Sequence, residues 1–103
     1  MADTRAETTG RYREEIVPVL KQFPQIERVT LFGSRAKGTA RSGADIDLAL
    51  EGDELRDAHL PAVYNAIDDL LLPVKVDLLL LTDRTKPELR EHIERVGVVW
   101  YAR

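Results

Sequence analysis

Two short motifs contain the residues of this sequence that could do chemistry. Gly33-Ser34 ends an apolar stretch, and after ten intervening residues come two aspartates separated by one residue, Asp45 and Asp47. Glycine lets the backbone turn sharply and lets a ligand approach closely, and free N–H groups at such a turn bind phosphate. Ser34 is placed to cap the turn and to present its hydroxyl. The first motif therefore predicts a phosphate-binding turn.

The second motif predicts a metal site. Residues i and i+2 of a strand share a face, so Asp45 and Asp47 would lie side by side while Ile46 and Leu48 point into the core. Carboxylates held so close repel each other unless a cation lies between them, and hard oxygen ligands favour Mg²⁺ or Mn²⁺. Asp77 interrupts another apolar stretch, where a carboxylate is unfavourable unless it is paired or bound to a metal. If the two strands are neighbours, three carboxylates converge, which implies two-metal phosphoryl or nucleotidyl transfer.

Basic side chains flank the predicted turn. Arg35, Lys37 and Arg41 lie within reach of it and could neutralise a triphosphate. A Walker-type phosphate loop is excluded, because Thr39 stands where that motif needs lysine and Ala40 stands where it needs serine or threonine. The sequence also lacks the G-x-G-x-x-G pattern of dinucleotide-binding proteins.

The elements that must position these residues alternate between helix and strand, which predicts an α/β (α+β) layer. Pro18 should kink or interrupt the first helix, and residues 34–38 should form a short helix or a tight loop. The last long strand is apolar enough to be covered on both faces. Apolar periodicity predicts helices over about 9–21, 60–72 and 87–96, and strands over 26–32, 45–50, 74–81 and 98–101.

Composition limits the class of protein. The 103 residues predict one domain, 44% of them are hydrophobic, and 32% are charged, which argues against disorder. No apolar run approaches the length of a membrane span, and no secretory signal is recognisable, so we expect a cytoplasmic protein. The net charge of −3 argues against direct nucleic-acid binding, and the absence of cysteine excludes disulfides and cysteine-ligated metal sites.

The Gly33-Ser34 pair followed by Asp45-Ile46-Asp47 resembles the motif of the nucleotidyltransferase superfamily of DNA polymerase β, and Asp77 matches the third carboxylate of that family. At this length the chain is similar to the minimal nucleotidyltransferases, which often act as antitoxins paired with HEPN-domain ribonuclease toxins. Ala44 departs from the pattern, since many relatives carry serine there. The resemblance implies a nucleotidyltransferase fold, a small mixed β-sheet flanked by helices, in a single minimal domain over residues 1–103.

The resemblance also implies a role for each motif residue. Gly33-Ser34 would hold the β- and γ-phosphates of ATP, and Asp45 and Asp47 would bind two Mg²⁺ ions. Asp77 would bind the catalytic ion and help to deprotonate the attacking hydroxyl, after which pyrophosphate leaves.

Larger members of the family carry a helical domain that helps to bind the acceptor. We expect no such domain in this short chain, so the resemblance implies that the acceptor is a partner protein. AMP would pass from ATP to a tyrosine hydroxyl of a partner HEPN toxin, and we expect a homo- or hetero-oligomer. Arg35 and Lys37 would bind the phosphates of the nucleotide. One alternative is an antitoxin that neutralises its toxin by complex formation without catalysis. A further alternative is a nucleotidyltransferase acting on a small molecule such as an antibiotic.

Overall fold

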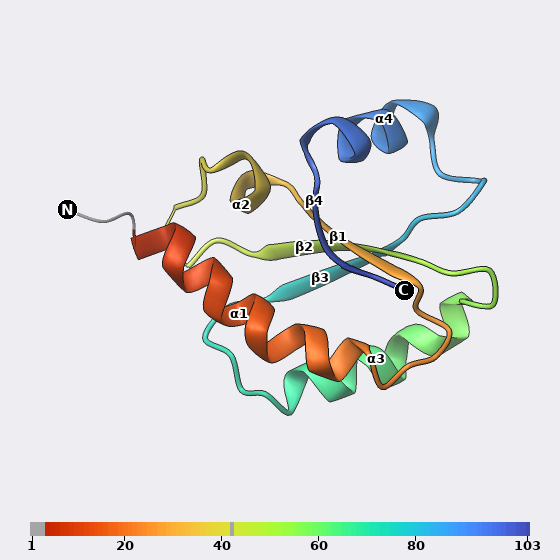
Figure 1. Cartoon of the computed structure of the whole chain (residues 1–103), viewed down its shortest axis with the longest axis horizontal. Coiled ribbons are helices and arrows are strands. Elements are labelled where there is room, and N and C mark those ends of the chain that lie inside the picture. Colours follow the sequence, from red (N-terminus) through yellow and green to blue (C-terminus); the bar gives the residue numbers. More distant parts are fainter. Residues whose placement is uncertain (1–3, 42) are drawn as a thin grey trace.

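Four strands form one mixed sheet in the order β3-β2-β1-β4 (Figure 1). The computed structural model describes residues 4–41 and 43–103. The central strand β1 is antiparallel to both β2 and β4, whereas β2 and β3 are parallel and are joined by a helical crossover. The strands are β1 (Arg28–Phe32), β2 (Ile46–Glu51), β3 (Val76–Leu80) and β4 (Val98–Ala102). The expected small sheet flanked by helices is confirmed.

The helices cover both faces of this sheet. Helices α1 and α3 pack on one face, and α4 lies over the other (Figure 1). The helices are α1 (Thr4–Leu20), α2 (Ser34–Lys37), α3 (Leu60–Asp68), which a short 3₁₀ turn (Asp57–His59) precedes, and α4 (Pro87–Val96). Within residues 4–41 and 43–103, no helix combines the length and apolarity that crossing a bilayer requires.

The larger of two hydrophobic clusters lies beneath α1 and α3. Alternate residues of β2 point into it, and Ile46, Leu48 and Leu50 are all fully buried, as the alternation with the acidic residues predicted. Ile16 and Leu20 of α1 are also fully buried in this cluster. The register of β2 is therefore fixed, because a slip of one residue would place Asp47 in the core.

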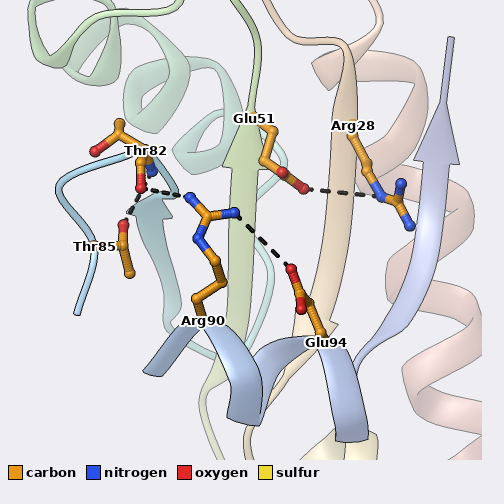
Figure 2. Close-up of polar contacts among 6 residues, drawn as sticks. All are labelled: Arg28, Glu51, Thr82, Thr85, Arg90 and Glu94. Carbon is orange, nitrogen blue, oxygen red and sulfur yellow. Dashed lines mark hydrogen bonds and ion pairs between the residues drawn. The ribbon is translucent and has the colours of Figure 1, made fainter. Parts of the chain in front are cut away.

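The smaller cluster lies beneath α4. Its buried members are Ala49, Leu81 and Ile93. Polar contacts tie α4 to the segment before it, where the Arg90 guanidinium donates a hydrogen bond to the Thr82 carbonyl at 2.5 Å (Figure 2). The contact is partly buried, and Glu94 lies 4.0 Å from the same guanidinium.

Side chains from two helices contact the outer strands of the sheet. The Tyr64 hydroxyl of α3 accepts the Leu78 N–H at 2.9 Å and lies 3.4 Å from the Leu78 carbonyl. On the other side, Arg13 of α1 donates to the carbonyl of Trp100, which stands at a break in the register between β1 and β4. Strand β3 packs on both faces as predicted, but it borders the sheet, so most of its side chains are only half-buried.

The observed helices correct two expected boundaries. Helix α1 begins at Thr4 rather than near residue 9 and runs through Pro18 to Leu20 without interruption. Pro18 lies in the last turn and removes one helical hydrogen bond, to the carbonyl of Glu14, and both residues are exposed to solvent. Helix α3 ends at Asp68 rather than near residue 72, and Leu71 then adopts a positive φ of 54°.

Candidate active site

The strand register brings two of the predicted carboxylates face to face. Asp47 of β2 and Asp77 of β3 are direct partners in the parallel pairing, which confirms that the two strands are neighbours. Neighbouring strands lie about 4.8 Å apart, so the two side chains leave the sheet from adjacent backbone positions on one face. Asp45 lies one residue before β2 and is exposed. The three carboxylates therefore lie in one region at the start of β2 and β3.

The electrostatics of Asp47 reflect this crowding. Partial burial raises the pKa of the Asp47 carboxyl above its ordinary value of 3.8, and the negative charges of Asp77 and Asp45 raise it further. A carboxylate that like charges destabilise in this way is relieved by binding a cation. The region thus favours a positive ligand.

Asp77 differs from its prediction in one respect. Its side chain is 41% exposed, because β3 lies at the border of the sheet, and it is not a buried charge. The Lys75 ammonium lies 3.4 Å from its carboxylate and supplies a partner. Lys75 precedes Asp77 by two residues and so shares its face of the strand. The sequence analysis did not predict Lys75 as a partner of Asp77. The i, i+2 spacing rule that was applied to Asp45 and Asp47 would have indicated this pair.

The donor set suits a hard divalent cation, but the side chains are spread apart. Among the residues that the structure describes, no three His, Cys, Asp or Glu side chains gather closely enough to hold one ion. Carboxylate oxygens are the donors that Mg²⁺ prefers, and Mg²⁺ typically takes only one or two carboxylates and keeps several waters. Asp45, Asp47 and Asp77 therefore fit such an ion by the chemistry of their donors.

Gly33 joins the phosphate-turn motif to the carboxylates. It has a φ of +77°, which glycine adopts without strain, and a Cβ added there would lie 2.3 Å from the Asp47 Oδ2. Because β1 and β2 are antiparallel, the end of β1 meets the start of β2, with Phe32 opposite Asp47. The two halves of the sequence motif are thus in direct contact, although ten residues separate them in the chain.

Ser34 does not cap the turn, contrary to prediction. It is the first residue of the one-turn helix α2, the cap position belongs to Gly33, and no side chain makes a capping hydrogen bond there. Gly33 takes the cap position with φ +77° and ψ −158°, so the helix begins at Ser34 itself, one residue earlier than a Ser34 cap would require. Gly38, also with a positive φ, ends α2.

The basic residues near the turn have different surroundings. Lys37 and Arg41 are exposed, as a phosphate-binding role would need. Arg35 is buried, and its guanidinium donates to the Ala44 carbonyl and to the Thr9 hydroxyl, both at 2.9 Å. The Tyr12 ring centroid lies 5.4 Å from the Arg35 Cζ. The contacts of Thr9 and Tyr12 with Arg35 join α1 to this region, and sequence reasoning missed them because the contacting residues are far apart in the chain.

Comparison with known proteins adds a family and a fold. The model of the polymerase beta nucleotidyltransferase family matches residues 14–103. The chain is 37% identical over 82 residues to a Haemophilus influenzae protein named probable protein adenylyltransferase MntA, and the match covers 79% of this chain and 71% of the relative.

Two solved structures share the fold. A crystal structure described as a toxin-antitoxin with AMP-PNP superposes with a TM-score of 0.73 at 22% identity, covering 88% of this chain and 73% of that one. The structure of a tri-AMPylated Shewanella oneidensis HEPN toxin in complex with MNT antitoxin gives a TM-score of 0.68 at 20% identity, covering 91% and 72%. At these identities the likeness establishes the fold.

Proposed function

This chain belongs to the polymerase beta nucleotidyltransferase family, and from that membership we propose that it transfers AMP from ATP to a hydroxyl of a partner protein. The observation that carries the proposal is the meeting of Gly33, Asp47 and Asp77 at one end of the sheet. A turn without a side chain, set against carboxylates that favour a cation, suits a nucleoside triphosphate with its metal ions.

Different residues bind the nucleotide and the metal ions. The backbone at Gly33 and Ser34 binds the β- and γ-phosphates, and the exposed Lys37 adds positive charge. Asp45, Asp47 and Asp77 would hold the two Mg²⁺ ions. When bound, these ions stabilise negative charge on the attacking and leaving oxygens.

The transfer itself is a displacement at the α-phosphorus of ATP. The acceptor oxygen forms the new bond to the α-phosphorus, the bond from that phosphorus to the oxygen of the β-phosphate breaks, and pyrophosphate leaves. The hydroxyl proton passes to a carboxylate at the site, a role that the family resemblance assigns to Asp77, whose side chain is 41% exposed.

The acceptor is proposed to be a tyrosine hydroxyl of a HEPN-type toxin, and the chain is proposed to act as its antitoxin. Support comes from the curated relative, which is named a protein adenylyltransferase, and from the similar structures, which pair an antitoxin with a toxin. AMP added near a ribonuclease site would block it by bulk and charge.

Intact mass spectrometry of the partner tests this function. A HEPN-domain protein from the same genome is co-expressed with the wild-type chain, with the Asp45→Asn/Asp47→Asn variant, or with Asp68→Asn/Asp69→Asn. The last pair removes two exposed acids at the end of α3 and is the matched control. We expect adenylyl mass increments with the wild type and the control, and none with Asp45→Asn/Asp47→Asn.

The same experiment decides between catalysis and complex formation. If no mass is added by any form while all three suppress toxicity equally, the chain neutralises its partner without chemistry, and the transferase proposal is wrong. If the purified chain adenylylates an antibiotic but not the protein, the acceptor is a small molecule.

A further inference from the structure

Arg35 is buried against other parts of the protein. It is 9% exposed, and it is one of the two polar side chains buried among the described residues, the other being Thr30. Its three contacts are with protein groups: the Ala44 carbonyl, the Thr9 hydroxyl and the Tyr12 ring. These contacts use two of the five guanidinium donors, and the burial of the side chain limits the access of a ligand to the others.

These contacts join three separate parts of the chain. Arg35 stands in α2, two residues after Gly33, whereas Thr9 and Tyr12 belong to α1. Ala44 directly precedes Asp45 in the connecting loop, by which we mean residues 43–45. The Ala44 N–H also closes a turn onto the Arg41 carbonyl at 3.0 Å. The backbone of Ala44 is therefore held on both its donor and its acceptor side.

We propose that Arg35 is a positioning residue that fixes the connecting loop, and with it Asp45, before any nucleotide or metal binds. The inference rests on the proposed function for its consequence, but the loop contact itself does not depend on that function. The positioning role replaces the phosphate-binding role that the sequence suggested for Arg35. Phosphate binding remains the proposed role of Lys37.

Arginine suits this position better than lysine would. Its planar guanidinium donates in two directions at once, here to Ala44 and to Thr9, and its flat face packs on the Tyr12 ring. Lysine carries the same charge on a single nitrogen and does not reproduce this fork. Replacement by lysine thus preserves the local charge while removing the geometry.

Amide hydrogen exchange of the ligand-free chain tests the positioning role directly. In Arg35→Lys and in Thr9→Val, we expect the Ala44 amide to exchange about tenfold faster, which is the effect of losing one hydrogen bond to a charged group. The Ile46 amide, bonded to the Lys75 carbonyl in the sheet, is the internal reference and should not change. Lys37→Ala removes an exposed charge from the same helix and should leave both amides unchanged.

Binding measurements separate positioning from phosphate contact. For Arg35→Lys we expect the Mg²⁺ concentration at half-maximal binding to rise about tenfold, with unchanged affinity for a non-hydrolysable ATP analogue measured without metal. Unchanged exchange at Ala44 in both Arg35→Lys and Thr9→Val would overturn the proposal, as would a loss of metal-free nucleotide affinity in Arg35→Lys. Because exchange is read without substrate, the result stands even if no transfer is detected.

Discussion

At the scale of single residues, the position of the Asp47 carboxylate lowers the stability of the metal-free folded chain. Its pKa is raised, so the folded chain holds the Asp47 proton more tightly than the unfolded chain does. The stabilisation is present below the ordinary value of 3.8 and is lost as the pH rises through the raised pKa. At neutral pH the ionised carboxylate is therefore a source of strain that a bound cation would relieve.

We expect Asp47→Asn to stabilise the metal-free chain at neutral pH. The gain should be roughly 0.2–1 kcal/mol, the size of a cross-strand charge pair, and it should shrink toward zero at acid pH, where the wild-type carboxyl is protonated. Denaturant unfolding across that pH range measures it.

Added Mg²⁺ should stabilise the wild type more than it stabilises Asp47→Asn. It should raise the melting temperature of the wild type through binding to the folded state and should have a smaller effect on Asp47→Asn. A variant less stable than the wild type at neutral pH and without metal would contradict the assignment of Asp47 as a repelled charge.

Gly33 and Gly38 both have a φ near +75°, but Gly38 is in the αL region with ψ 13°, whereas Gly33 has ψ −158°, a conformation that is essentially confined to glycine. Alanine at Gly38 meets no atom within 4 Å and should lose only about 1 kcal/mol for the left-handed conformation. Alanine at Gly33 meets the Asp47 carboxylate as well. We expect Gly33→Ala to lower stability further than Gly38→Ala and to abolish nucleotide and Mg²⁺ binding, which Gly38→Ala should largely retain. Thermal denaturation measures the stability of the two variants, and calorimetry measures their binding. Equal effects of the two substitutions would refute the contact between Gly33 and Asp47.

Much of the site was predictable from residue spacing. The alternation in β2 placed Asp47 on the face opposite the core, and the Gly-Ser spacing predicted a turn near it. The ion pair of Lys75 with Asp77 and the burial of Arg35 were harder to predict, because they depend on which strand borders the sheet and on how α1 crosses α2. Apolar periodicity carries information on a residue's own element and little on contacts across the chain.

At the scale of elements, the hydroxyl of Tyr64 joins α3 to the backbone of β3. Tyr64→Phe preserves the ring and removes both contacts with Leu78, one of which is a backbone N–H bond at 2.9 Å. We expect a loss of about 1 kcal/mol in the free energy of unfolding and faster exchange of the Leu78 amide. The Leu80 amide serves as the comparison, and equal acceleration of both would show that the hydroxyl has only a general effect.

The strands were predicted better than the helix ends. Each expected strand is present within about two residues, because alternation and β-branched side chains mark half-buried strands clearly. The early start of α1 at Thr4 and the early end of α3 at Asp68 have no comparable signal, since polar residues extend one helix and leucines follow the other. Leu71, predicted inside the helix, is instead 87% exposed.

At the scale of the whole molecule, the two layers of the core are unequal. Helices α1 and α3 share a large buried cluster, whereas α4 covers three buried residues and is tied to Thr82 by Arg90 (Figure 2). Regions with little buried apolar surface open at lower free energy. We therefore expect the amides of α4 to exchange through a local opening that leaves β1 and β2 closed.

A pair of arginines on α4 tests this expectation. Arg90→Gln removes the bond to Thr82 and should lower the opening free energy of α4 by about 1 kcal/mol. Arg95→Gln removes only an exposed pair with Glu91 at 4.0 Å and should have little effect. Native-state hydrogen exchange measures both, and a uniform opening of all elements would argue for a single cooperative unit.

The contacts of Tyr64 and Arg13 with the two outer strands have a consequence for assembly. A free strand border is a template on which extended peptides add and fibrils grow. Here the Tyr64 hydroxyl binds Leu78 in the middle of β3, and the Arg13 guanidinium binds the Trp100 carbonyl at the irregularity of β4. Polymerisation by strand addition is thereby disfavoured, so association with other proteins falls to the helices and loops, whose side chains can distinguish one partner from another.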